Sequence, residues 1–405
     1  MGGSSVPSLQ TNSRVPMEGG PVAALCHALG ELGMAGHIRV EAVGQGSAMD
    51  SLVVIPDLKR PRILVPAGQR RAASGALQRY SADLSVRQRL QRRAASALVR
   101  LWGPRPPVAR HQLSLDLGIS QGLIAHLSEV FKQPITFSMT IGTARANQKP
   151  ILQLFSLSGT SLGFVKVGTN DFTAHLVRQE AANLRELQER RFEHFAVPRF
   201  LHSGVWEGLE LLVMGTLPTS ALASTKRLGH LKSQAEQELH RTFHRGEQPL
   251  EQSRWLAQLL TTEWAGEPTS ELWVKWRRAL DALASNHGEK TVEFTASHGD
   301  WTAWNMADHR GRLQVWDWER FARDVPAGFD QLHFAVHQEF RRTGVSQRTL
   351  LAALGEQQRF SRTTQACYLA DLAGRYLLGE REQQLATVQQ KTEVLVTVLE
   401  TILGE

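Results

Sequence analysis

The chain has 405 residues, which is more than one small hydrophobic core needs. Its composition, with 42% apolar and 21% charged residues, is ordinary for a globular protein and excludes a disordered or fibrous one. No apolar run reaches the roughly 18 residues of a membrane-spanning helix, and the first residues lack the apolar segment of a secretory signal. The two cysteines, Cys26 and Cys367, have neither metal-ligand spacing nor the number that a disulfide framework needs. We therefore expect a cytoplasmic protein.

The formal charge of +7 is concentrated in one segment. Between Asp57 and Arg110 there are thirteen Lys and Arg residues and only two acidic residues. Such a segment is typical of a solvated helix surface, and it is also typical of a contact with an anionic membrane surface or a nucleic acid. Both interpretations stay open at this stage.

The first 110 residues show a tail and a small mixed region. Residues 1–20 predict a disordered tail, and residues 21–110 predict a basic α/β accessory region with short strands at 52–56 and 63–66. A basic amphipathic helix is expected at 85–102, with Ser85 as its N-cap. Its apolar residues recur every three or four positions, as a packing face would: Val86, Leu90, Ala94, Leu98 and Leu101.

The remaining chain divides into a β-rich part and a helical part. Residues 116–217 follow the order β-β-β-α-β-β, with strands at 135–141, 150–156, 161–167, 197–201 and 209–214 and a helix at 172–191. Residues 218–405 are mostly helical and contain one β-type island at 293–318. The fold class predicted from this order is α+β.

Two short motifs in the helical part carry oxygen-bearing side chains. His298 and Gly299 lead into Asp300, Asn305 lies five residues further on, and Asp317 comes twelve residues after Asn305. Phosphoryl transfer needs a carboxylate near the acceptor hydroxyl, ligands that hold Mg²⁺ on the phosphates, and a cation on the phosphates. In a loop between strands, the aspartate can face the acceptor while the amide oxygen turns to the metal. A second carboxylate adds the hard oxygen that Mg²⁺ prefers.

This pattern resembles the catalytic loop and metal motif of the aminoglycoside phosphotransferases, choline kinases and their relatives. The resemblance implies a bilobal protein-kinase-like fold, with a small antiparallel-sheet N-lobe at 116–217 and a mostly helical C-lobe at 218–405. It implies that Asp300 is the catalytic base and that Asn305 and Asp317 bind Mg²⁺, with Glu319 as an auxiliary ligand. The accessory region at 21–110 is then an addition to that fold.

The β-rich part resembles the small lobe of the same family. The strand that contains Lys166 is similar to the third strand of that lobe, and Glu180, fourteen residues later, matches the helical glutamate that pairs with the lysine. Residues 209–218 resemble the last strand and the hinge, where backbone groups of Gly215 and Leu217 would meet the adenine edge. The expected phosphate-covering loop, 141–149, contains one glycine and lacks the Gly-x-Gly-x-x-Gly pattern of protein kinases.

Two further residues near these motifs have structural interpretations. His298 is expected to brace the catalytic loop by hydrogen bonding, although a histidine near neutral pH is also a conceivable base. Asp330 resembles an aspartate that opens a large-lobe helix in this family, and an N-cap role explains it without a catalytic function.

The resulting hypothesis is a Mg²⁺-dependent enzyme that transfers the γ-phosphate of ATP or GTP to a hydroxyl of a small molecule. The acceptor stays open among sugars, nucleosides, amino alcohols and secondary metabolites. An alternative is a non-catalytic kinase-like scaffold that binds an anionic partner through residues 59–110. A protein kinase is disfavoured by the His-Gly lead into Asp300 and by Glu319, which stands where protein kinases have glycine.

Overall fold

The computed structural model describes residues 10–11, 29–30, 32, 38–44, 51–79, 84–115, 122–141, 149–219, 225–262, 271–382 and 386–404. The chain divides into two compact units. The first, called the sheet unit, comprises residues 1–144, 148–188 and 198–217, and the second, called the helical unit, comprises residues 145–147, 189–197 and 218–405. Because a largely antiparallel sheet and a mostly helical part follow one another along the chain, the predicted α+β class with two parts is confirmed.

The sheet unit contains one ten-stranded sheet in the order β1-β2-β5-β3-β4-β6-β7-β8-β11-β10. Its strands are antiparallel to their neighbours, except for the parallel pair of β1 and β2. Their bounds are β1 Gln10–Thr11, β2 Ile38–Ala42, β3 Ser51–Ile55, β4 Ile63–Pro66, β5 His111–Leu115, β6 Ile135–Thr140, β7 Ile151–Ser156, β8 Ser161–Gly168, β10 Phe200–Trp206 and β11 Leu209–Met214. The strands of the expected accessory region and of the expected small lobe therefore share one sheet, joined by β4 and β6. The division into an accessory region at 21–110 and a small lobe at 116–217 stays a prediction.

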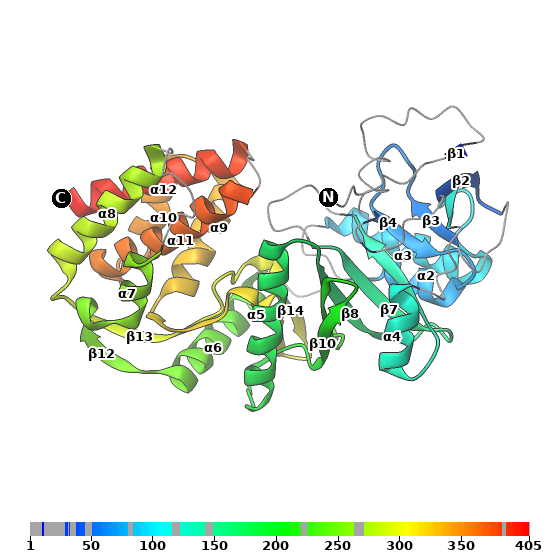
Figure 1. Cartoon of the computed structure of the whole chain (residues 1–405), viewed down its shortest axis with the longest axis horizontal. Helices are drawn as coiled ribbons and strands as arrows, with labels where there is room; N and C mark the ends of the chain where they lie inside the picture. The colour runs from blue at the N-terminus through cyan, green and yellow to red at the C-terminus, as the bar shows by residue number, and fades with distance from the viewer. Residues whose placement is uncertain are drawn as a thin grey trace. The chain divides into compact units, whose positions relative to one another are not determined.

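Helices of the sheet unit pack on both faces of this sheet, as the blue and green part of Figure 1 shows. They are α2 (Arg70–Leu77), α3 (Val86–Trp102), α4 (Leu123–Phe131) and α5 (Asp171–Gln188). Buried residues of α4, such as Leu127, share a core with Val165 and Val167, whereas α2 and α3 cover the other side of β3 and β4. The alternating direction of side chains along each strand supplies both cores.

The basic helix α3 begins as the sequence predicts and packs differently. Ser85 and Gln88 form a reciprocal capping box, so the expected N-cap is confirmed. The packing face predicted from the apolar residues is wrong, because Leu90 and Leu101 are 59% and 62% exposed. The buried face contains Ser96, whose hydroxyl is hydrogen-bonded to Ser74 of α2 at 2.9 Å. Contact of this segment with an anionic surface stays a prediction.

The helical unit packs its helices around one apolar core with two small sheets beside it. Its helices are α6 Thr225–Phe243, α7 Arg254–Leu260, α8 Glu271–His287, α9 Phe329–Thr343, α10 Gln347–Gly355, α11 Arg362–Glu382 and α12 Ala386–Gly404. One sheet has the order β12-β13-β16 and the other β14-β15-β9, with bounds β9 Phe195–Ala196, β12 Gly246–Pro249, β13 Thr291–Ser297, β14 Met306–His309, β15 Arg312–Val315 and β16 Ala322–Pro326. Within the described part of the chain, no helix is both long and apolar enough to cross a membrane.

Candidate active site

Lys166 and Glu180 form a buried ion pair inside the sheet unit. Lys166 lies on β8 between two core valines, so strand alternation turns its side chain to the opposite face, on which α5 packs. Its Nζ lies 2.5 Å from Oε2 of Glu180, and both side chains are buried. The pairing expected from the sequence is therefore present. Because a buried charge is costly without a partner, each of these two residues holds the other in place.

The expected hinge follows β11. The backbone N–H of Gly215 donates a hydrogen bond of 2.8 Å to the carbonyl oxygen of Arg199. Any contact of Gly215 with a nucleotide must therefore use its carbonyl oxygen, while both backbone groups of Leu217 remain part of the hypothesis. Most of the expected phosphate-covering loop, residues 142–148, lies outside the described residues.

The loop that follows β13 in the helical unit requires a glycine before its aspartate. Gly299 has φ +81°, a conformation that side chains of L residues rarely adopt. A Cβ atom at this position would also lie 2.5 Å from the carbonyl oxygen of Arg320. Gly299 is thus required both by the backbone turn and by the close approach of the segment after β15.

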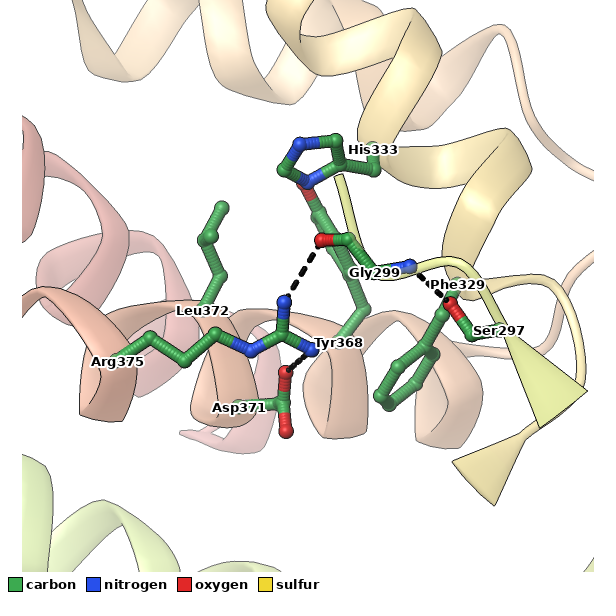
Figure 2. A pocket seen from close by; sticks show the side chains of 8 residues that line it. All are labelled: Ser297, Gly299, Phe329, His333, Tyr368, Asp371, Leu372 and Arg375. Atoms are coloured by element: carbon green, nitrogen blue, oxygen red, sulfur yellow. Dashed lines mark hydrogen bonds and ion pairs between the residues drawn. The ribbon is translucent and has the colours of Figure 1, made fainter. Parts of the chain in front are cut away.

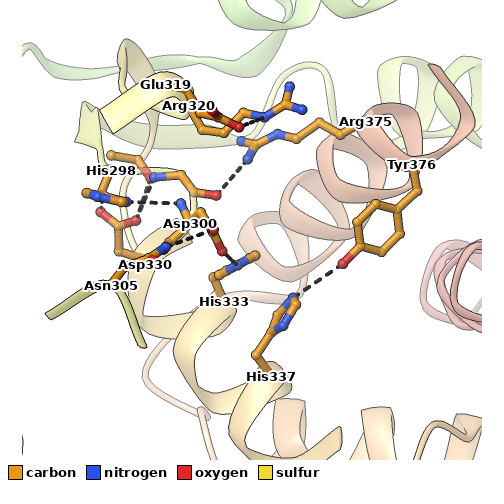
Figure 3. A network of polar contacts seen from close by, with 12 residues as sticks. His298, Asp300, Asn305, Glu319, Arg320, Asp330, His333, His337, Arg375 and Tyr376 are labelled. Carbon is orange, nitrogen blue, oxygen red and sulfur yellow. Dashed lines mark hydrogen bonds and ion pairs between the residues drawn. The ribbon is translucent and has the colours of Figure 1, made fainter. Parts of the chain in front are cut away.

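Asp330 holds this loop from α9, as Figure 3 shows. Its carboxylate accepts hydrogen bonds from the hydroxyl of Ser297 at 2.8 Å and from the backbone N–H groups of His298 and Gly299 at 2.8 and 3.0 Å. The N-cap role predicted for Asp330 is wrong, because the N-cap of α9 is Gly328. The aspartate instead satisfies buried donors of a loop that has no ladder partner of its own.

His298 braces the loop as predicted. Its ring is buried, Nε2 lies 3.1 Å from the carbonyl oxygen of Trp316, and Nδ1 lies 3.2 Å from the backbone N of Asp300. A neutral imidazole that donates through Nε2 and accepts through Nδ1 satisfies both contacts. The ring therefore connects the aspartate loop to the segment that carries Asp317.

Both carboxylate oxygens of Asp300 have a donor beside them. Nδ2 of Asn305 lies 2.9 Å from Oδ2 of Asp300 and 2.9 Å from its carbonyl oxygen, and Nε2 of His333 lies 3.0 Å from Oδ1. The Asp300 side chain is 33% exposed. Partial burial, followed by the negative charge of Asp317, raises the pKa of Asp300 above its ordinary value. A carboxylate with a raised pKa is a better proton acceptor than an ordinary aspartate.

His333 is a site residue that the sequence reasoning missed. It is buried, and its burial, followed by the charge of Arg375, lowers its pKa to about 3. The ring is therefore neutral at physiological pH and donates its Nε2 proton to Asp300, while Nδ1 lies 3.3 Å from the hydroxyl of Tyr368. The available signal was its position three residues after Asp330, which places both side chains on the same face of one helix.

Arg375 of α11 supports the loop from a third direction. Its guanidinium donates to the carbonyl oxygen of Gly299 at 2.7 Å and pairs with Asp371 at 2.5 Å. These residues line a cavity of about 10 Å³, which Figure 2 shows beside the loop. Such a volume is close to that of one water molecule, so this cavity is not a pocket for an organic acceptor.

Asp317 and Glu319 follow β15 in the same unit. Asp317 has φ +72°, a left-handed conformation that is uncommon for a residue other than glycine and is enriched at functional sites. It lies near enough to Asp300 for its charge to raise the pKa of that residue. Glu319 is buried, with Oε1 4.0 Å from Nε of Arg320. The amide oxygen of Asn305 and the carboxylates of Asp317 and Glu319 are hard oxygen donors, the kind of ligand that Mg²⁺ prefers.

No protein-family model and no curated protein matches the chain. Among solved structures, the chain is similar to a thermostable mutant of aminoglycoside phosphotransferase APH(4)-Ia, with 13% identity over 68% of this chain and 99% of that chain and a TM-score of 0.47. It is also similar to spectinomycin phosphotransferase APH(9)-Ia in complex with ADP and spectinomycin, with 12% identity over 69% and 98% of the chains and a TM-score of 0.40. A third is amicoumacin kinase hAmiN in complex with AMP-PNP and Ca²⁺, with 13% identity over 66% and 88% and a TM-score of 0.40. All three similarities are structural, at 12–13% sequence identity and with TM-scores below 0.5.

Proposed function

We propose that this protein is a phosphotransferase that moves the γ-phosphate of ATP or GTP to a hydroxyl group of a small molecule. The observation that carries the proposal is the arrangement around Asp300. One carboxylate oxygen accepts from Asn305, the other accepts from a neutral histidine, and a third of the side chain is exposed. A carboxylate that is both oriented and accessible is what a general base for an acceptor hydroxyl requires.

The proposed roles of the neighbouring residues follow from their contacts. Because Nδ2 of Asn305 is hydrogen-bonded to Asp300, its amide oxygen is the group that would bind a metal ion. Asp317 supplies a carboxylate and Glu319 an auxiliary one. Mg²⁺ bound by these oxygens would neutralise phosphate charge during transfer. In the sheet unit, Lys166 would bind the phosphates while Glu180 fixes its position.

The proton of the acceptor hydroxyl would pass to Asp300 as its oxygen bonds to the γ-phosphorus, while the bond from that phosphorus to the β-phosphate oxygen breaks and ADP or GDP leaves. His333 and Asn305 donate hydrogen bonds to the carboxylate and so keep its accessible lone pairs in one direction. The hinge contacts would involve the carbonyl oxygen of Gly215 and the backbone of Leu217. The acceptor is proposed only as a small molecule with a hydroxyl group, since the described charges of the helical unit are mixed.

The proposal is tested by nucleotide turnover in the presence of pooled hydroxyl metabolites, measured as ADP or GDP release. Asp300→Asn should lower turnover about 10²–10⁴-fold, the range by which a general base accelerates a reaction. Nucleotide affinity measured by calorimetry should change little, since Asp300 is not assigned to the nucleotide. Asp281→Asn, an exposed carboxylate on α8, is the matched control and should retain full turnover. Turnover at the wild-type rate in Asp300→Asn would remove Asp300 from the mechanism.

A further inference from the structure

Two histidines and a glutamate converge on the helical unit away from the Asp300 loop. His240 lies in the last turn of α6 and His244 directly follows that helix, four residues later, so both rings lie on one side of it. Nε2 of His240 lies 3.0 Å from Oε1 of Glu293 on β13, and Nδ1 of His244 lies 3.2 Å from the same oxygen. All three ligand atoms lie within 4.8 Å of one another.

These separations agree with those between ligands of one metal ion. Zinc binds imidazole nitrogen and carboxylate oxygen at about 2.0–2.1 Å, and tetrahedral geometry then separates two ligand atoms by about 3.3 Å. The distances of 3.0 and 3.2 Å in the structure are close to this value. Glu293 is therefore spaced from both histidines as a neighbouring ligand would be, and the two imidazole nitrogens lie within 4.8 Å of each other.

A second carboxylate stands beside the cluster. Strand pairing places Glu247 of β12 directly opposite Glu293, so both side chains leave the same face of the sheet. Like charges at directly opposed positions destabilise a strand pair, and a bound cation would remove that repulsion. The neighbouring Arg245 is paired with Asp324 at 2.8 Å.

We propose that His240, His244 and Glu293 form a binding site for a divalent transition-metal ion, with Glu247 on the neighbouring strand adding negative charge beside it. Imidazole nitrogen favours zinc, cobalt, nickel or copper, whereas the all-oxygen set around Asp317 favours Mg²⁺. The side chains of the three residues are between 35% and 47% exposed, so an ion can enter from solvent. The ion would join α6 to β13, the strand that leads into the loop of Asp300, and would stabilise that connection.

The site is tested on the full chain without an affinity tag, after removal of metal by a chelator. Titration with Co²⁺ should produce the visible absorption bands of a low-coordinate cobalt site, and Zn²⁺ should displace Co²⁺ and raise the thermal unfolding midpoint. His244→Asn and Glu293→Gln should each weaken binding by about tenfold or more. His230→Asn, an exposed histidine on the same helix, is the matched control and should bind as the wild type does.

Two results would overturn the proposal. One is a wild-type chain that binds no Co²⁺ at micromolar concentration, because the three side chains would then form only a hydrogen-bonded cluster. The other is wild-type affinity in both ligand variants. Asp317→Asn, measured in the same titration, should retain the cobalt bands, and their loss would assign the ion to the oxygen ligands near Asp300. Since metal binding is read without nucleotide or acceptor, failure of the proposed phosphotransfer would leave this result unaffected.

Discussion

Replacement of Asp330 should destabilise the helical unit more than its single charge suggests. The carboxylate accepts from the Ser297 hydroxyl and from two backbone N–H groups, all of them buried. A hydrogen bond to a charged group contributes about 1.5–3 kcal/mol, and a buried donor left without a partner costs about 1–3 kcal/mol. Because the three bonds share one acceptor group and do not add, we expect Asp330→Ala to cost about 3–5 kcal/mol of unfolding free energy.

Asp330→Asn separates the hydrogen bonds from the charge. One amide oxygen can still accept from Ser297 and Gly299, but the amide NH₂ then faces the N–H of His298, so two donors oppose each other. We expect a loss of about 2–3 kcal/mol, intermediate between the wild type and Asp330→Ala.

The assay for both variants is urea unfolding followed by tryptophan fluorescence, since Trp276, Trp301 and Trp318 are fully buried in the helical unit. Asp281→Ala, which removes an exposed carboxylate from α8, should change the unfolding free energy by less than about 0.5 kcal/mol. If Asp330→Ala cost less than about 1 kcal/mol, the three hydrogen bonds would not be what holds the loop.

Lys166→Met should destabilise the sheet unit by about 3–5 kcal/mol, because the buried carboxylate of Glu180 would lose the cation that is paired with it. Hydrogen exchange of β8 measures this loss, and Glu180→Leu in the same chain should restore most of it. Gly299→Ala should lower the free energy of unfolding more than Gly311→Ala does. Both glycines have a positive φ, but only a Cβ atom at Gly299 would lie 2.5 Å from a backbone oxygen. Equal free energies of unfolding in the two variants would contradict this. Because the pKa of His333 is lowered to about 3 in the folded chain, its ring binds a proton below pH 6.5 in the unfolded chain but stays neutral in the folded chain down to about pH 3. The free energy of unfolding therefore falls as the pH falls through this window, and at pH 5 this loss is about 2 kcal/mol. The stability of His333→Gln should lack this contribution when measured at pH 7 and pH 5, and an unchanged pH dependence would refute the assignment.

Local sequence patterns predicted most elements of the fold because their signals are local. The capping box at Ser85 uses residues within one turn of helix, and the strand around Lys166 shows its two core valines by alternation. Boundaries were less predictable. The strand expected at 197–201 begins at Phe200, since Pro198 lacks the N–H that a strand ladder needs, and residues 195–196 pair with β15 instead.

The packing of α3 could not be predicted from its apolar residues. Small side chains at Ser74 and Ser96 let α2 and α3 approach closely enough for their hydroxyl groups to bond. The spacing of apolar residues along α3 does not predict this close approach, because the approach depends on side-chain size and on the partner helix. The predicted face therefore included Leu90 and Leu101, which the structure exposes.

In the candidate site, too, the residues that are close together in the sequence were predictable and those far along the chain were not. Asp300, Asn305 and Asp317 are recognisable because their side-chain chemistry and spacing lie within eighteen residues of sequence. The groups that hold Asp300 and its loop come from much further along the chain: Asp330, His333 and Arg375. The backbone N–H groups of His298 and Gly299 donate to a carboxylate from α9, and the carbonyl oxygen of Gly299 accepts from a guanidinium of α11, so groups from other helices satisfy buried polar atoms of the loop. If Asp300 is the base, the rate of transfer depends on these distant residues, and changes to them should lower kcat more than they raise KM.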